Sequence, residues 1–471
     1  MLCHRACKRE AFLKPDPINS LNLTPKTMNN LSLKKRILEQ HLPASSATRL
    51  VVLTGARQTG KTTLSKTKYS DLRYINLDSP ENRETLRNLS TASWAGTVGH
   101  AILDEAQKEP VVFEKVKYAF DEGKIAFTVL TGSSQIMLLK KIRESLAGRA
   151  FFYELWPLMQ CEMNPPKGGD DLPAPLLFHL LTTEDLRSIL SDIPAVILEE
   201  QDIKFRKAED HILTWGGMPA LLPLSDSERW KWLKDYGYTY LERDLSDLAR
   251  LDDLSPFRKF QKLSALRSGM LLNYSELARD TGISVDTARR YLEYLRLSYQ
   301  TVLLQPYYQN LTSSVVKTPK LYWTDIGILR QLTGFRGEMT GELFETMVVS
   351  ELIKGLKTSQ IDADIYFYRT RSGMEMDILI KTRAGFIGME IKSRQRVVRQ
   401  DIRVMKEIAA RLGKQWIGGM VVYRGNEIKR IGEPDIWAVP SRRLFQDRFM
   451  GSVGSGDTLK LSNNFISACD I

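Results

Sequence analysis

The chain of 471 residues lacks the features that mark membrane, secreted or disulfide-bonded proteins. No apolar run approaches the ~18 residues that a membrane-spanning helix needs, so we expect no membrane partner. The first residues carry scattered charges without the hydrophobic segment of a secretory signal. The four cysteines, at positions 3, 7, 161 and 469, are too few for a disulfide framework at this length. These absences predict a protein of the reducing cytoplasm.

The composition is that of an ordinary globular protein with an excess of positive charge. It is 43% hydrophobic and 26% charged, and its length predicts about three domains. Lysine and arginine number 67 against 56 acidic residues, which gives a net charge of +11. Such an excess favours an anionic partner, of which DNA is a common one. A basic soluble protein with no such partner has the same charge, so the balance alone leaves both open.

A strand–loop–helix pattern lies between residues 49 and 64, which read RLVVLTGARQTGKTTL. An apolar run predicts a buried strand, and the next residues match G-x-x-x-x-G-K-[ST], whose backbone N–H groups and helix N-terminus surround a phosphate. We expect Lys61 to reach the β- and γ-phosphates of ATP and the Thr62 hydroxyl to ligate Mg²⁺. A glycine-rich turn that binds nothing is the alternative, which the strand context disfavours. The expected nucleotide-binding residues are Gly55, Ala56, Arg57, Gln58, Thr59, Gly60, Lys61, Thr62 and Thr63.

Two adjacent acids end a later apolar strand, residues 101–105, which read AILDE. This pattern follows the phosphate-binding loop in ATP hydrolases. Asp104 would hold Mg²⁺, directly or through water, and Glu105 would orient and polarise the attacking water. The alternative is that both acids only cap the helix that follows.

A further apolar strand, residues 127–130, runs into the sequence TGSS. A polar side chain there can lie between the two acids and the γ-phosphate, and Ser133 and Ser134 are equal candidates. Their rival role is to cap a helix N-terminus. Strands that alternate with helices in this way predict an α/β fold with a doubly wound parallel sheet.

These motifs, together with LAGR at 146–149 and ELWPL at 154–158, resemble those of a family of prokaryotic AAA+-type P-loop ATPases. That family carries a C-terminal domain of unknown function with a PD-(D/E)XK nuclease-like fold, and the resemblance covers about residues 31–430. It implies that Arg149 is placed like an arginine finger, which stabilises the charge that develops on phosphoryl transfer. Such an arginine usually comes from a neighbouring subunit, so a homo-oligomer is implied. An ordinary surface arginine is the alternative.

The middle of the chain predicts a helix-turn-helix over residues 273–302, with strands near 306 and 320–323 as the wing of a winged helix. Arg289 and Arg290 would lie on the exposed face of its second helix, where they can contact DNA. Winged helices also act as spacers between proteins, so DNA contact stays one of two roles. The preceding turn, WGGMP at 215–219, is expected to be structural, with a hinge as one form of that role.

The C-terminal half predicts the order α-β-β-β-α-β, which is the core of PD-(D/E)XK nucleases. Asp377 and Glu390 could ligate Mg²⁺, Lys392 could stabilise developing charge, and Glu345 matches the auxiliary acid of that fold. The D…E-x-K spacing is common by chance, and a fold can persist without its activity. The predicted elements are a helix at 341–356, strands at 364–368, 375–380 and 386–392, a helix at 400–412 and a strand at 419–423.

We therefore expect an ATP hydrolase whose nucleotide state moves a DNA-binding, nuclease-like half. The alternatives are an ATP-dependent regulatory switch or scaffold with an inactive nuclease fold, and a nuclease whose P-loop binds ATP without turnover. The expected divisions are a flexible tail (1–30), an AAA+-like ATPase domain (31–165), a helical lid or linker (166–255), a winged helix-turn-helix (256–325), a PD-(D/E)XK nuclease-like domain (326–430) and a C-terminal segment with a flexible tail (431–471).

Overall fold

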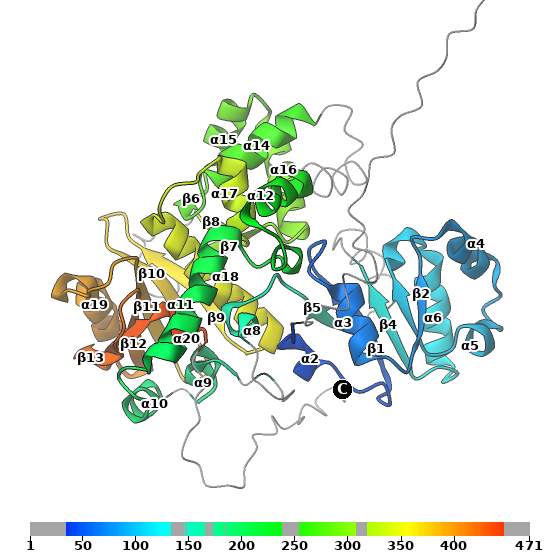
Figure 1. The fold of residues 1–471 in the computed structure, drawn as a ribbon, viewed down its shortest axis with the longest axis horizontal. Helices are drawn as coiled ribbons and strands as arrows, with labels where there is room; N and C mark the ends of the chain where they lie inside the picture. The colour runs from blue at the N-terminus through cyan, green and yellow to red at the C-terminus, as the bar shows by residue number, and fades with distance from the viewer. Residues whose placement is uncertain are drawn as a thin grey trace, which may run out of the picture. The chain divides into compact units, whose positions relative to one another are not determined.

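The computed structural model describes residues 34–132, 146, 148–164, 172, 174–183, 185–237, 254–307 and 318–446. Their strands form one sheet of five and one of nine, and Figure 1 traces the helices that accompany them. All of these elements belong to a single unit that begins at Lys35. Within the described part of the chain, no helix is both long and apolar enough to span a membrane.

The five-stranded sheet has the order β2-β3-β4-β1-β5, and every neighbouring pair in it is parallel. This confirms the predicted parallel α/β sheet. Its strands are β1 (Arg49–Thr54), β2 (Arg73–Asn76), β3 (Ala101–Asp104), β4 (Phe127–Thr131) and β5 (Ala150–Glu154). Its helices are α3 (Lys61–Lys68), α4 (Pro80–Asn88), α5 (Trp94–Thr97) and α6 (Val111–Asp121), preceded by the short α2 (Leu38–His41) and joined by η1 (Ala106–Lys108).

Helices cover both faces of this sheet because alternate residues of β1 point to opposite sides. Leu50 and Val52 pack in one cluster with residues of α4, α5 and α6. Val51 and Leu53 pack in another cluster with Leu64 of α3. The sheet is therefore doubly wound. The loop after β1 lies at the carboxyl ends of its strands.

The middle of the chain is mostly helical. Its first helices are α8 (Gln160–Met163), α9 (Leu176–Thr183), α10 (Leu186–Asp192), α11 (Glu199–Trp215), η2 (Pro219–Leu221) and α12 (Asp226–Tyr236). The residues that follow α12, 238–253, lie outside the described part. The elements after that gap are α14 (Ser255–Ala265), β6 (Met270–Leu271), α15 (Tyr274–Thr281), α16 (Val285–Leu297), β7 (Thr301–Pro306) and β8 (Lys320–Trp323).

Helices α15 and α16 lie at the positions that the sequence predicts for the two helices of a helix-turn-helix. Gly282 ends α15 in the left-handed region, with φ of 85°, where a residue without Cβ is favoured. Ser284 begins α16, since its side chain accepts a hydrogen bond from the backbone N–H of Thr287 at 3.1 Å. The two helices thus have the stop and start signals that the sequence contains.

The C-terminal elements follow the predicted order. They are α17 (Ile326–Thr333), α18 (Gly341–Ser359), β9 (Asp364–Arg369), β10 (Glu375–Lys381), β11 (Phe386–Lys392), η4 (Arg399–Ile402), α19 (Arg403–Leu412), η5 (Gly413–Gln415), β12 (Trp416–Tyr423), β13 (Lys429–Gly432), β14 (Ile436–Pro440) and α20 (Ser441–Leu444). Apolar residues of α18 pack on one face of the strands and those of α19 on the other.

The nine-stranded sheet has the order β13-β14-β12-β11-β10-β9-β7-β8-β6 and crosses the expected division near residue 325. The crossing is made by β7 and β9, which pair in parallel through Gln305 with Tyr366 and Pro306 with Phe367. At the other end, β14 pairs in parallel with β12, so residues 436–440 belong to the sheet. The strands of the helix-turn-helix segment and those of the C-terminal segment are therefore one hydrogen-bonded surface.

The turn at 215–219 is closely packed. A Cβ atom on Gly327 would lie 1.9 Å from the Trp215 carbonyl oxygen, and one on Gly217 would lie 2.2 Å from the Leu158 carbonyl oxygen. The Leu158 N–H donates to the Gly217 carbonyl at 2.7 Å, and the buried Asp325 carboxylate accepts from the Gly217 N–H at 2.8 Å. Glycine is needed here for close backbone approach, which favours a rigid junction over a hinge.

Candidate nucleotide site and C-terminal acid cluster

The loop after β1 has the backbone that its glycines predict. Gly60 lies in the left-handed region, with φ of 97°, directly before α3 begins at Lys61. A Cβ on Gly55 would lie 2.1 Å from the Leu155 carbonyl oxygen, so the loop passes too close to the chain after β5 for a larger residue. The Lys61 ammonium donates to the carbonyls of Gly55 and Ala56 at 2.9 and 2.7 Å. The Lys61 side chain therefore folds back onto the phosphate-binding loop that precedes it.

Asp104 is the centre of polar contacts at this edge of the sheet. It lies at the end of β3 and is 4% exposed. One carboxylate oxygen accepts from the Thr62 hydroxyl at 2.7 Å and from the Tyr74 hydroxyl at 2.8 Å, and the other accepts from Thr131. Burial, followed by the hydrogen bond to Asp104, raises the pKa of Tyr74 well above its ordinary value. All three partners are thus neutral donors at physiological pH.

The donor set fits Mg²⁺. A hydroxyl and a carboxylate oxygen converge at Thr62 and Asp104, and among the described residues no lysine or arginine forms an ion pair with Asp104. No group of three or more His, Cys, Asp and Glu side chains that could hold a metal occurs in the described part of the chain. That result agrees with Mg²⁺ at this place, since Mg²⁺ takes one or two protein ligands and completes its shell with phosphate oxygens and water.

Glu105 follows Asp104 with φ of 55°, in the left-handed region that few residues other than glycine adopt. Its carboxylate accepts a hydrogen bond from the Gln107 side chain. This turn carries Glu105 away from the line of β3 while it stays next to Asp104. Ser133 and Ser134 lie outside the described residues. That one of them lies near the γ-phosphate therefore stays a prediction.

Arg149 lies directly before β5, whereas the phosphate-binding loop follows β1. Because β1 and β5 are parallel, Arg149 lies at the amino ends of the strands and the loop lies at their carboxyl ends. The Arg149 guanidinium forms an ion pair with Asp121 at the end of α6. Arg149 therefore cannot reach the loop of its own chain, and only action on another subunit is compatible with the predicted role.

Three side chains that the sequence analysis did not single out contact the phosphate-binding loop or the strand before it. The Tyr299 hydroxyl, after α16, hydrogen-bonds the Thr54 hydroxyl at 2.5 Å, and the Tyr236 hydroxyl, in α12, donates to the Arg57 carbonyl at 3.3 Å. Arg36 donates to the Thr59 carbonyl at 2.9 Å.

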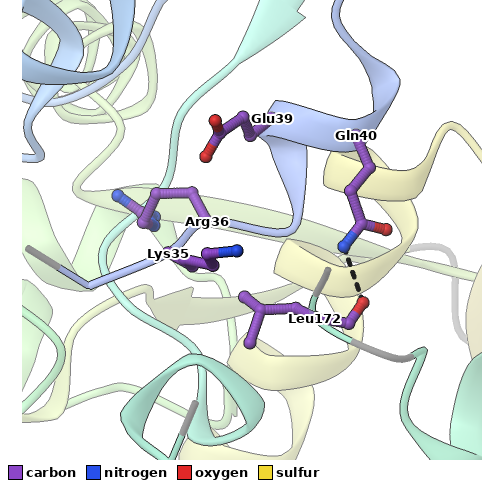
Figure 2. Close-up of a pocket in the computed structure, with 5 residues that line it drawn as sticks. All are labelled: Lys35, Arg36, Glu39, Gln40 and Leu172. Carbon is purple, nitrogen blue, oxygen red and sulfur yellow. Dashed lines mark hydrogen bonds between the residues drawn. The ribbon is translucent and has the colours of Figure 1, made fainter. Parts of the chain in front are cut away.

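Arg36 also forms an ion pair with Glu162. Its Nε atom lies 3.1 Å from the Glu162 carboxylate, and both side chains are buried. Figure 2 shows Arg36 beside a small pocket that Lys35, Glu39, Gln40 and Leu172 also line, where the Gln40 side chain donates to the Leu172 carbonyl at 2.6 Å. The partners of these loop contacts lie far apart in sequence, so no local pattern could have predicted them.

The predicted acids of the C-terminal half do come together. Asp377 lies on β10 where the pairing with β9 shifts by one residue, between Met376 and Leu379. Such a bulge redirects a side chain. The Asp377 carboxylate accepts from the backbone N–H of Ile391 on β11 at 2.7 Å. On the same strand, the Lys392 ammonium pairs with Glu390 at 2.6 Å.

A second lysine enters this cluster from β8. Lys320 is 4% exposed, and its ammonium lies 2.7 Å from Glu375 and 3.3 Å from Glu345. The Tyr322 hydroxyl, two residues along the same strand, donates to Glu345 at 2.6 Å. Alternation of Lys320 and Tyr322 in a strand that is otherwise apolar is a signal that sequence reasoning could have used.

Charge and burial act together in this cluster. Burial raises the pKa of Asp377, and the neighbouring carboxylates of Glu390 and Glu345 raise it further. Burial also raises the pKa of Glu390, against the opposing effect of Lys392. Burial lowers the pKa of Lys320, but the carboxylates of Glu345, Glu375 and Asp377 outweigh it and raise the pKa above its ordinary value. Burial also lowers the pKa of Lys392, but the carboxylates of Asp377 and Glu390 outweigh it and raise the pKa, so both lysines are charged.

This donor set does not fit Mg²⁺ as the sequence predicted. Glu390 is paired with Lys392, Glu345 and Glu375 share Lys320, and Asp377 accepts a backbone N–H.

Arg289 and Arg290 are exposed on α16, as predicted. Arg289 lies 3.3 Å from the Asp286 carboxylate, and Arg290 donates to the Thr287 hydroxyl at 3.2 Å. The same face carries a further acid–base pair, between Glu293 and Arg296 at 2.7 Å. The exposed face of this helix is thus of mixed charge.

Three family models match separate parts of the chain. Residues 47–164 match an AAA domain, residues 206–338 match a domain of unknown function (DUF8612), and residues 340–444 match another (DUF4143). Together with the geometry of Lys61, Thr62 and Asp104, the first match supports a P-loop ATPase domain. The other two matches assign no activity to the remainder of the chain.

Uncharacterized proteins of Mycobacterium bovis and Mycobacterium tuberculosis are each 28% identical over 354 residues, which cover 73% of this chain and 70% of theirs. Among solved structures, the Walker-type ATPase PABY2304 of Pyrococcus abyssi is 16% identical and covers 63% of this chain and 93% of its own, with a TM-score of 0.38. AMPPCP-bound DnaA from Aquifex aeolicus is 15% identical, and the match covers 55% of this chain and 87% of the DnaA chain, with a TM-score of 0.22. Likeness at these TM-scores carries no inference about function.

Proposed function

We propose that this chain binds and hydrolyses ATP with Mg²⁺ at the loop after β1. The observation that carries the proposal is the surroundings of Asp104, whose carboxylate accepts from three neutral hydroxyls and stands beside Thr62. A carboxylate that is buried without a counter-ion favours a cation at that place. The AAA-domain match over residues 47–164 supports the same assignment.

The residues of the site take distinct roles in this proposal. The backbone N–H groups of the loop and the N-terminus of α3 hold the phosphates, and Lys61 moves from the loop carbonyls to the β- and γ-phosphate oxygens. Thr62 and Asp104 would hold Mg²⁺, which would neutralise phosphate charge. Glu105 would orient a water molecule and accept its proton as the water attacks the γ-phosphorus, while the bond from that phosphorus to the β–γ bridging oxygen breaks and ADP leaves.

We further propose that the state of the loop is passed to the rest of the chain. Tyr299 and Tyr236 contact it from segments beyond the AAA match, and Arg36 contacts it from before that match. Tyr299 also packs edge-on against Trp156, with ring centroids 5.0 Å apart. A loop that changes on nucleotide binding would alter these contacts. A homo-oligomer in which Arg149 serves a neighbouring subunit belongs to the same proposal.

The partner that the charge balance supports is DNA, bound through α16. The support is the net charge of +11 and the order helix, strand, two helices and two strands from α14 to β8, which is typical of a winged helix. The second candidate is an ATP-dependent switch or scaffold without nuclease activity, located in the cytoplasm like the first. The ion pairs that Lys320 and Lys392 make with acids of the C-terminal cluster favour the absence of nuclease activity there.

ATP turnover in three variants tests the hydrolase. We expect Lys61→Ala to lose nucleotide binding and turnover together. Glu105→Gln should keep binding and lose turnover by about 100-fold or more, because it removes the base and leaves the phosphate contacts. Glu114→Gln, which changes an exposed acid on α6, is the matched control and should behave as native. No turnover by the native chain, alone or with DNA, would contradict the proposal.

Salt-dependent DNA binding by fluorescence anisotropy tests the partner. Arg290→Ala should lower the slope of log affinity against log salt by about one, as the loss of one phosphate contact does. Arg289→Ala should lower it less, because Asp286 already neutralises that side chain. Binding without salt dependence would reject DNA as the partner, whatever the ATPase result.

A further inference from the structure

The acid cluster of the C-terminal half contains a lysine that the D…E-x-K pattern does not include. Lys320 comes from β8, while the acids that it contacts come from α18 and β10. Its side chain is 5% exposed, and its ammonium lies within 3.3 Å of both Glu345 and Glu375. An isolated ammonium so deeply buried would be costly, so its carboxylate partners are needed to keep it charged.

Three of the four carboxylates in the cluster already have a cationic partner, whereas Asp377 accepts a backbone N–H. Glu375 also lies 3.2 Å from the Arg369 guanidinium, and Glu345 also accepts from Tyr322. Glu390 is satisfied by Lys392 on its own strand. A divalent cation would have to displace an ammonium that is already in contact with two carboxylates, and the displaced ammonium would remain buried and close to it.

We infer that Lys320 is the resident cation of this cluster and that Glu345, Glu375 and Asp377 bind no divalent metal ion in the native chain. The cluster is an ionic junction, which fastens β8 of the helix-turn-helix segment to α18 and β10 of the C-terminal segment. The metal that the nuclease-like resemblance implies does not fit residues arranged in this way. This inference does not depend on ATP hydrolysis at the loop after β1.

Replacement of Lys320 by an uncharged residue of similar length leaves the carboxylates without their counter-ion, so the variant should acquire a cation site. Lys320→Met is therefore expected to bind Mn²⁺ at least about tenfold more tightly than the native chain in the absence of nucleotide, because a full charge a few ångströms away has been removed. Its thermal unfolding midpoint should fall in EDTA and recover when Mn²⁺ is added.

Electron paramagnetic resonance of Mn²⁺, with the full chain and no nucleotide, provides the measurement. Lys381→Met is the matched control, since Lys381 is an exposed lysine at the end of β10. It should bind Mn²⁺ as the native chain does. In Lys320→Met, a further Asp377→Asn change should remove the acquired site, which locates it in the cluster.

Two results would overturn the inference. One is Mn²⁺ binding by the native chain that Asp377→Asn abolishes, because the cluster would then be a metal site with Lys320 present. The other is a folded Lys320→Met variant that gains no affinity over native. If Lys320→Met does not fold, the comparison of native with Asp377→Asn decides by itself: equal Mn²⁺ binding by both supports the inference, and loss in Asp377→Asn rejects it.

Discussion

The nucleotide site lies on the parallel five-stranded sheet, and the C-terminal acid cluster lies on the mixed nine-stranded sheet. Both contain acidic residues, but their negative charge is balanced in different ways. Asp104 receives hydrogen bonds from the hydroxyls of Thr62, Tyr74 and Thr131. In the cluster, Lys320 and Lys392 make ion pairs with the acids. Neutral donors hold a carboxylate in place and leave its charge available, whereas an ammonium cancels it.

The comparison teaches that acids at suitable spacing do not by themselves make a metal site. Asp104 and Asp377 each follow a sequence pattern that predicts Mg²⁺, and each lies where its pattern places it. What separates them is the charge of their neighbours, and those neighbours come from distant parts of the chain. Lys320, for example, belongs to a strand that the sequence analysis assigned to the wing of a winged helix.

The largest expected effect separates the two aspartates directly. Asp104→Asn should lower ATP turnover by about 100-fold or more, because it removes the only carboxylate that we assign to Mg²⁺. Asp377→Asn should leave turnover within about twofold of native. Steady-state phosphate release measures both, and circular dichroism checks that each variant is folded. A loss of turnover in Asp377→Asn comparable to that in Asp104→Asn would break the comparison.

A smaller effect is expected at the turn of residues 215–219, which packs closely against α17. Gly327→Ala should lower the free energy of unfolding by about 1–3 kcal/mol, because its Cβ would lie 1.9 Å from the Trp215 carbonyl oxygen. Gly96→Ala is the control, since nothing lies within 4 Å of a Cβ there. Urea unfolding compares the two, and equal stability of Gly327→Ala and native would show that the turn is loose enough to act as a hinge.

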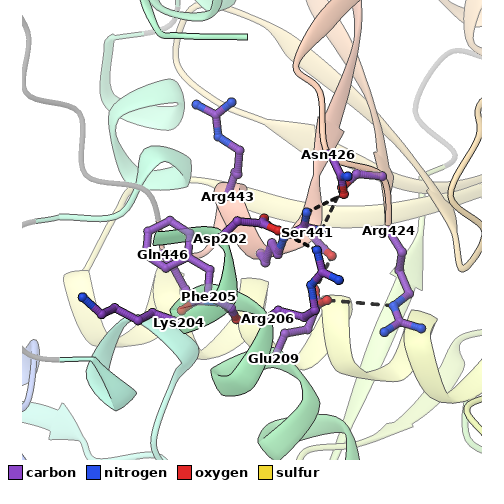
Figure 3. Close-up of polar contacts among 12 residues, drawn as sticks. Asp202, Lys204, Phe205, Arg206, Glu209, Arg424, Asn426, Ser441, Arg443 and Gln446 are labelled. Carbon is purple, nitrogen blue, oxygen red and sulfur yellow. Dashed lines mark hydrogen bonds and ion pairs between the residues drawn. The ribbon is translucent and has the colours of Figure 1, made fainter. Parts of the chain in front are cut away.

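The smallest effect concerns Glu209, a buried acid balanced by arginines. Figure 3 shows Glu209 of α11 with Ser441 and Arg424, and its carboxylate lies 3.9 Å from the Arg424 Nε atom. Arg442 also acts on it electrostatically, and Asp210 opposes both arginines. Burial is the largest influence and raises the pKa of Glu209 above its ordinary value of 4.5, against the effect of the arginines.

A raised pKa sets the sign of the pH dependence. The stability that Glu209 contributes is fully present below its ordinary pKa and is lost as pH rises through the raised value. Glu209→Gln should therefore lose less stability than native between pH 4.5 and neutral pH, although Asp325 and Glu351, whose pKa values burial also raises, act in both proteins. Urea unfolding across this range measures the difference, and a steeper loss in Glu209→Gln would contradict the assignment.

Much of the architecture could be predicted because its signals are local. The strand and loop around Lys61, the caps at Gly282 and Ser284, and the order of elements from α18 to β12 all follow from periodicity and turn residues. The Asp104 strand end and the D…E-x-K residues were found in the same way. Local patterns of this kind also placed Arg149 before β5.

The features that escaped prediction depend on partners distant in sequence. Pairing of β7 with β9 joins two segments that composition separates, and β14 continues the sheet beyond the expected division at residue 430. Arg36, Tyr299 and Lys320 acquire their roles from residues that the fold brings to them. A single sequence contains no periodic signal for such contacts, so only the folded chain shows that the two acid sites differ.

The most direct test of this account counts Mn²⁺ ions bound per chain in the presence of a non-hydrolysable ATP analogue. The account predicts one ion in the native chain, its loss in Asp104→Asn and its retention in Asp377→Asn, since of the two acid sites the Thr62–Asp104 pair is the one without a lysine in contact with its acids. A second ion in the native chain that disappears in Asp377→Asn would contradict the account, as would an ion that persists without Asp104.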